Sequence, residues 1–190
     1  MKNYKEIFDS IELISKENGA SNVKIIKVEQ IEFNPIFRDM CIANHCGMYN
    51  KCYMCPPSIG KVEKLVEIIK KYKFAAVFQT ITTLEDSYDF EGMLSAKKTI
   101  FSIIEGLREL CKKLNLDDVM LFGPGGCGVC EKCAKEINEV CRFPELAIHS
   151  LEAYCVDVYK LANTASMKYI NGNDTVTYFG FLLFGGETLG

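Results

Sequence analysis

The pattern of apolar and polar positions predicts helices that alternate with strands along most of the chain. In four segments apolar residues recur every three or four positions, the spacing that gathers them on one face of a helix. Four other segments are short, rich in β-branched and aromatic residues, and typical of strands. The predicted helices are residues 4–17, 60–72, 91–114 and 149–167, and the predicted strands are residues 23–33, 74–83, 118–122 and 175–184.

This order of elements predicts an α/β fold with a sheet of about four strands, largely parallel or mixed, flanked by helices. The length of 190 residues is typical of a single domain, 1–190. Residues 36–58 and residues 123–145 have no such period and are predicted to be loops. Both follow a predicted strand, and sites in open α/β sheets collect at the carboxyl ends of strands. We therefore expect the two loops to lie near each other.

The loop of residues 123–145 carries cysteines in a CxxCxxC pattern, and seven residues separate the last of them from a fourth cysteine. One turn with this spacing can wrap three sulfurs around a single [4Fe–4S] cluster. Zinc also takes four thiolates, but zinc sites usually pair two separate CxxC motifs. The spacing therefore favours a cluster over zinc. The predicted ligands in this loop are Cys127, Cys130, Cys133 and Cys141.

The loop of residues 36–58 holds a second cysteine group and ends in two prolines. Its CxxC motif also resembles a redox pair, but thioredoxin-like pairs open a helix, which the following prolines do not suit. A second [4Fe–4S] cluster is predicted here, and a crossed arrangement, in which one loop lends a cysteine to the other cluster, stays open. His45 is expected to be a solvated loop residue. The predicted ligands are Cys41, Cys46, Cys52 and Cys55.

The two remaining cysteines, Cys111 and Cys155, lie in predicted helices without a cysteine nearby in sequence. Buried cysteines of this kind usually act as small hydrophobic core residues. Core positions are therefore predicted for both, with an approach of Cys155 to a cluster as the alternative.

The net charge and the hydropathy of the chain indicate which partners and which cellular compartment to expect. The net charge of −3 disfavours nucleic acid as a partner. No apolar run approaches the roughly 20 residues of a membrane span, and the charged N-terminus lacks the apolar core of a signal peptide. We therefore expect a cytoplasmic protein that binds neither membrane nor nucleic acid. Cysteines stay reduced in that compartment, where clustered thiols are typical of metal sites.

The cysteine motifs and the segment after them resemble a family of predicted metal-binding proteins, domain of unknown function 2284. The resemblance implies metal or iron–sulfur binding without a defined reaction. Positions 50 and 155 depart from the family pattern, because they hold Asn and Cys where it favours glycine. Cys52 fills a position without a family cysteine, so the resemblance supports Cys41, Cys46 and Cys55 in its loop. The matching residues are 46–49 (CGMY), 55–57 (CPP), 126–134 (GCGVCEKCA), 141–145 (CRFPE) and 150–158 (SLEAYCVDV).

Three functions are compatible with these motifs. The leading hypothesis is a protein with two [4Fe–4S] clusters that passes electrons to or from a redox partner protein. The second is an enzyme in which a cluster with only three thiolates has an open iron. In that enzyme Arg142 would hold an anionic substrate and Glu152 or Asp157 would move protons, although salt bridging or helix capping is the commoner role of such residues. The third is a structural zinc protein.

Overall fold

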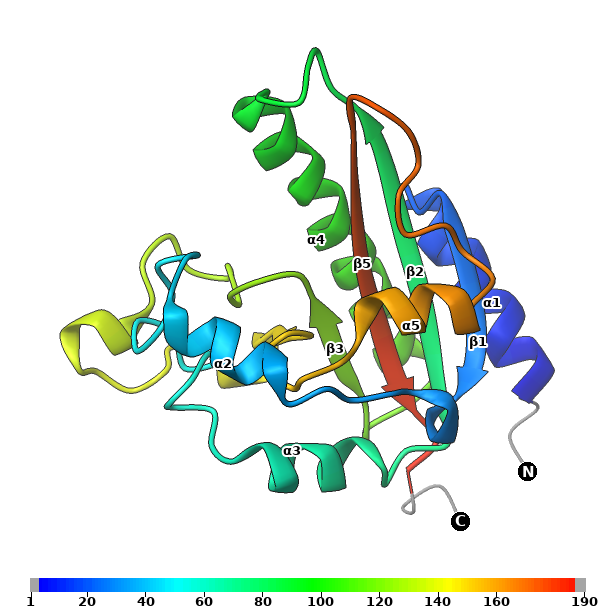
Figure 1. The fold of residues 1–190 in the computed structure, drawn as a ribbon. Helices are drawn as coiled ribbons and strands as arrows, with labels where there is room; N and C mark the ends of the chain where they lie inside the picture. Colours follow the sequence, from blue (N-terminus) through cyan, green and yellow to red (C-terminus); the bar gives the residue numbers. More distant parts are fainter. Residues whose placement is uncertain (1–3, 187–190) are drawn as a thin grey trace.

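The computed structural model describes residues 4–186, which form a five-stranded sheet with helices packed on both of its faces (Figure 1). The strands are β1 (Asn22–Lys27), β2 (Phe74–Thr83), β3 (Met120–Gly123), β4 (His149–Ser150) and β5 (Thr175–Phe184). The α-helices are α1 (Tyr4–Glu17), α2 (Ile36–Ala43), α3 (Val62–Ile69), α4 (Phe90–Lys113) and α5 (Val158–Thr164). Short 3-10 turns are η1 (Val28–Gln30), η2 (Ala134–Ile137) and η3 (Pro144–Leu146).

The sheet is mixed, which confirms the predicted α/β class. Its strand order is β1-β2-β5-β3-β4, and every neighbouring pair is antiparallel except β3 and β4. At the centre, Gly180 of β5 lies opposite Phe78 of β2. A Cβ atom at Gly180 would lie 2.5 Å from the carbonyl oxygen of Phe122. Real Cβ atoms essentially never approach backbone atoms that closely, so glycine at this position allows β5 to pack closely against its neighbouring strands.

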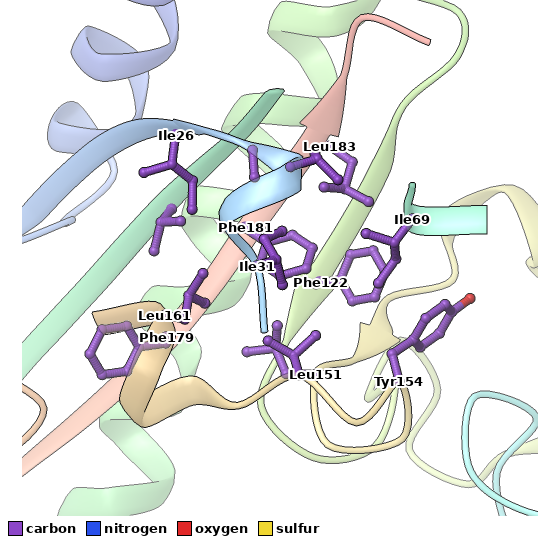
Figure 2. Close-up of a cluster of buried hydrophobic side chains, with 14 of the residues drawn as sticks. Ile26, Ile31, Ile69, Phe122, Leu151, Tyr154, Leu161, Phe179, Phe181 and Leu183 are labelled. Carbon is purple, nitrogen blue, oxygen red and sulfur yellow. The ribbon is translucent and has the colours of Figure 1, made fainter. Parts of the chain in front are cut away.

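Two apolar clusters hold the helices to the sheet, one on each face. Helices α1 and α4 cover one face, and α3 and α5 lie on the other (Figure 1). Figure 2 shows the cluster under α3 and α5, where Leu161 and Ile69 lie at opposite ends of the cluster on the same face of the sheet. The rings of Phe122 and Phe181 lie at its centre, with centroids 4.4 Å apart. These rings anchor β3, the strand that leads into the cysteine loop of residues 123–145.

The prediction of one helix over residues 149–167 is wrong in its first half. Residues 149–150 form β4, a turn follows, and α5 begins only at Val158. Asp157 caps α5, because its side chain accepts a hydrogen bond of 3.1 Å from the backbone N–H of Lys160. Cys155 has φ of +59°, a left-handed conformation that no helix interior contains. The predicted strand over 23–33 is likewise shorter, since β1 ends at Lys27 and η1 follows.

The prediction that residues 36–58 lack a helix is also wrong, because the segment begins with α2. The apolar residues Ile36, Met40 and Ile42 of α2 are each more than half exposed. α2 is only eight residues long, which is shorter than the window over which a helical period can be recognised. α2 ends at Asn44, whose φ of +57° is a left-handed C-cap.

His149 makes the folded state sensitive to acid. Its Nδ1 is hydrogen-bonded to the Tyr154 hydroxyl at 3.0 Å, and its ring packs on Phe122 with centroids 5.1 Å apart. Burial lowers the pKa of His149 to about 4. In the unfolded chain the pKa of a histidine is about 6.5, so the unfolded state takes up a proton at a higher pH than the folded state does. The folded state therefore keeps its full stability above about pH 6.5 and loses this contribution as the pH falls towards 4.

We predict that His149 lowers the free energy of unfolding by about 2 kcal/mol when the pH falls from 7 to 5. Urea unfolding at the two pH values measures the loss. His149→Asn is the control, because its amide oxygen can accept the Tyr154 hydrogen bond but does not titrate. The wild-type protein should lose about 2 kcal/mol more than the variant. Equal losses in both proteins would contradict the assignment.

Candidate metal centre

The two cysteine loops lie side by side beyond one end of the sheet (Figure 1) and enclose two adjoining pockets. Each pocket has a volume of about 280 Å³. The expectation that the two loops lie near each other is therefore confirmed. The thiols that line the first pocket are Cys52, Cys127, Cys130, Cys133 and Cys141. The thiols that line the second pocket are Cys41, Cys46 and Cys55.

The first pocket is built on a glycine turn that follows β3. Gly125 and Gly128 both have φ of +71°, a conformation that favours glycine. A Cβ atom at Gly128 would also lie only 2.6 Å from the ring of Phe101 on α4. The turn brings Cys127 inward, where its sulfur accepts a hydrogen bond of 3.3 Å from the backbone N–H of Ile148. Amide hydrogen bonds of this kind tune cysteine sulfurs that ligate clusters.

Cys52 and Cys55, the dividing pair, separate the two pockets. Their thiols are 1% and 6% exposed, and each lines a different pocket. The Cys55 thiol donates a hydrogen bond to Cys52, which lowers the pKa of Cys52 and raises that of Cys55. The backbone N–H of Cys127 and the thiol of Cys133 contribute further hydrogen bonds to Cys52. The hydrogen bond between Cys52 and Cys55 therefore favours a state in which only one thiol of the pair is ionised.

Met48 and Gly126 complete the division, since both residues line both pockets. A Cβ atom at Gly126 would lie 3.1 Å from Cε of Met48 and 3.7 Å from Sγ of Cys55. The first contact is tighter than almost all real Cβ contacts, so a larger residue would push Met48 away. The absence of a side chain at Gly126 thus allows the two loops to meet.

Arg38 of α2 has a role that sequence reasoning missed. Its Nη2 donates a hydrogen bond of 2.9 Å to the carbonyl oxygen of Ala153, which joins α2 to the turn after β4. This contact brings Cys41 next to that turn. The guanidinium charge lowers the pKa of the Cys41 thiol, but burial raises it by more. No spacing signal in the sequence pairs these residues, because 115 positions separate Arg38 from Ala153.

Both positions that depart from the family pattern have a left-handed backbone conformation. Cys155 and Asn50 occupy the two positions where the family favours glycine, and their φ angles are +59° and +58°. Asparagine tolerates this left-handed conformation better than most residues do, whereas cysteine has no such advantage. The backbone geometry that suits glycine is therefore kept at both positions.

The other candidate residues divide into structural and pocket-lining groups. Arg142 pairs with Glu139 at 3.9 Å and its Nη1 donates to the carbonyl oxygen of Lys132, so salt bridging is its role. Asp157 is the cap of α5. Neither residue lines a pocket, whereas Glu152 lines the second one. His45 is exposed at the edge of that pocket, as expected for a solvated residue.

The two cysteines outside the loops are buried, as predicted. Cys111 is 3% exposed on α4 among apolar side chains, and burial raises its pKa to about 11. Cys155 is fully buried, and burial raises its pKa as well. It lines neither pocket. Cys111 therefore serves as a control residue for experiments on the pocket thiols.

The fold and the paired thiol pockets define a cysteine-rich α/β domain of a predicted metal-binding class. A family model described as "Predicted metal-binding protein (DUF2284)" matches residues 24–184. The chain therefore belongs to the DUF2284 family of predicted metal-binding proteins. No curated protein and no solved structure matches the chain. None of the helices in residues 4–186 is long and apolar enough to cross a bilayer.

Proposed function

We propose that the chain is an iron–sulfur protein that holds two [4Fe–4S] clusters side by side and passes electrons to or from a partner protein. The observation that supports this proposal is the pair of adjoining thiol-lined pockets, separated by the dividing pair. Clusters of this type supply one-electron redox chemistry when they are bound. Two of them in adjoining pockets would form a short path for electrons through the protein.

The structure favours a division of ligands that differs from the four-plus-four arrangement expected from the loops. Five thiols line the first pocket, because Cys52 joins the four cysteines of residues 123–145. Three thiols remain in the second pocket. We infer that Cys52 is a ligand in the first pocket, as in two-cluster ferredoxins, where one cysteine of a motif ligates the other cluster.

The shape of the pockets fits a group of several atoms better than a single ion. In residues 4–186, no three His, Cys, Asp or Glu side chains converge closely enough to hold one metal ion. The thiols instead surround hollows of about 280 Å³. This volume is many times the roughly 30 Å³ that one water molecule occupies in the liquid. A cluster fits such a hollow, whereas four zinc ligands must meet within about 2.3 Å of one point.

Metal and sulfide analysis of anaerobically purified protein tests the proposal. We expect a brown protein with about eight iron atoms and eight sulfides per chain, as two four-iron clusters require. Stoichiometric zinc should not be found. Reduction with dithionite should then give the electron paramagnetic resonance signal of reduced clusters. A colourless protein that contains zinc without sulfide would contradict the proposal and favour the structural zinc alternative.

A cluster-dependent enzyme is the second candidate function. The observation that favours it is the number of thiols in the second pocket, which is one too few to ligate all four irons of a cluster. Catalytic metal sites keep such a position for a substrate. In this candidate function, a cluster in the first pocket would supply electrons, and a cluster in the second pocket would bind the substrate.

A further inference from the structure

The second pocket combines three thiols with one carboxylate. Among the described residues that line it, Glu152 is the only acidic one, and Cys41, Cys46 and Cys55 are the only cysteines. Glu152 and Cys41 lie close enough for the carboxylate charge to act on the thiol. Three sulfur donors and one oxygen donor therefore line this pocket, with the exposed imidazole of His45 at its edge.

Glu152 is held in place through only one of its two carboxylate oxygens. Oε2 accepts a hydrogen bond of 3.1 Å from the backbone N–H of Gly125 and another of 2.9 Å from the hydroxyl of Ser150. No other hydrogen bond to this carboxylate is found in residues 4–186. Ser150 is itself buried, and its hydroxyl oxygen accepts a hydrogen bond of 3.2 Å from the backbone N–H of Ala153, so the position of the Glu152 carboxylate is fixed. Oε1 is thus left available as a metal ligand.

The rest of the second pocket is largely apolar. Its aliphatic and aromatic lining comes from α2, from the loop after α2 and from the first of the two prolines. Such a lining favours a ligand with an apolar body and disfavours a charged one. The apolar lining residues are Phe37, Met40, Met48, Tyr49 and Pro56.

We propose that Glu152 is an exchangeable oxygen ligand to a cluster held by Cys41, Cys46 and Cys55, and that the second pocket admits a small apolar molecule whose single donor atom replaces it. This proposal rests on the proposed function, because it needs a cluster in the second pocket. Iron in clusters prefers thiolate ligands, so a carboxylate is the ligand of the four that a thiol-bearing molecule can displace. In this exchange the Fe–O bond would break, an Fe–S bond would form, and the thiol proton would pass to the released Glu152 carboxylate.

Substitutions of Glu152 test the proposal in anaerobic, cluster-loaded protein. The probe is thiophenol, an apolar thiol, and 4-mercaptobenzenesulfonate is the charged thiol for comparison, because both are aryl thiols of similar acidity. The readouts are iron content and the electron paramagnetic resonance spectrum of the reduced protein. We expect thiophenol to change the wild-type spectrum at a concentration roughly tenfold or more below that of the charged thiol, because the pocket is apolar.

The variants should separate ligation from folding. Glu152→Cys provides a fourth thiolate, so it should retain its iron and no longer respond to thiophenol. Glu152→Gln keeps an oxygen that accepts both hydrogen bonds but ligates iron more weakly, so it should respond at lower thiophenol concentrations than the wild type. Glu67→Gln is the matched control, because Glu67 is an exposed acid of α3 that lines neither pocket. It should respond as the wild type does.

Two results would overturn the proposal. One is a wild-type spectrum that thiophenol leaves unchanged while iron and sulfide are present. The other is a thiophenol response in Glu152→Cys or Glu152→Gln that equals the wild-type response. A wild-type protein that contains no iron and no sulfide would instead contradict the proposed function, so the iron count distinguishes the two failures.

Discussion

Cys130→Ala is expected to remove about half of the bound iron and to destabilise the metal-loaded fold. Cys130 lines the first pocket, and metal binding to such a loop contributes directly to folding free energy. The same result is expected for Cys127→Ala and Cys133→Ala, which remove the other two cysteines of the CxxCxxC motif. Iron and sulfide counts measure the cluster, and thermal unfolding under anaerobic conditions measures the stability.

Cys111→Ala is the control for the three variants. Cys111 is a buried cysteine of α4 that lies in the apolar cluster beneath α1 and lines neither pocket. Its replacement should cost on the order of 1 kcal/mol and leave the iron content unchanged. Undiminished iron in all three variants of the CxxCxxC motif would contradict the assignment of the first pocket.

Cys52→Ser is expected to lower the iron content by about half as well, although Cys52 belongs to the other loop. Cys52 is buried and lines the first pocket, where the Cys133 thiol helps to lower its pKa. A spare thiol beside an iron–sulfur cluster would be prone to oxidation, so ligation is the more stable use of this position. The remaining cluster, in the second pocket, should still respond to cyanide or a small thiol.

Cys141→Ser provides the comparison for Cys52→Ser, because Cys141 lines the same pocket from the other loop. Iron retention in Cys141→Ser with iron loss in Cys52→Ser would support a ligand set that crosses between the loops. If Cys52→Ser keeps all of its iron while Cys141→Ser loses half, residues 123–145 hold their cluster alone. The expectation for Cys52 would then be wrong.

The elements that could be predicted from the sequence are those with long, regular patterns. The predicted strands 74–83 and 175–184 and the predicted helix 4–17 match β2, β5 and α1 at both ends. Each of these elements buries one face or both faces in the core, so its apolar period reflects its packing. The α2 helix has only eight residues and buries none of them fully, so its apolar spacing was too short to distinguish it from a loop.

The apolar spacing over residues 149–157 was misleading for a different reason. These residues are buried in a turn under the sheet, where Leu151, Tyr154 and Val156 pack in the cluster shown in Figure 2 without helical geometry. Capping by Asp157 and the left-handed backbone at Cys155 exclude a helix there. Periodicity reports which residues are buried, and a compact turn can bury the same positions as a helix.

The site was predictable as two groups of cysteines, but not as two pockets. Cysteine spacing identified both loops, and their places after strands indicated that they meet. The spacing did not show that Cys52 and Cys55, three residues apart, line different pockets. That division depends on how the loop of residues 36–58 folds against Gly126, a contact between residues distant in sequence.

The thin partition formed by the dividing pair has a consequence for a chain loaded with both clusters. Charge added in one pocket acts on the other through a low-dielectric protein interior, where Coulomb interactions are much stronger than in water. The first electron therefore makes the second harder to add, and this penalty is the same whichever pocket is reduced first. A redox titration of such a chain would give two separate steps even if the isolated clusters had equal potentials, so the protein would exchange electrons singly rather than in pairs.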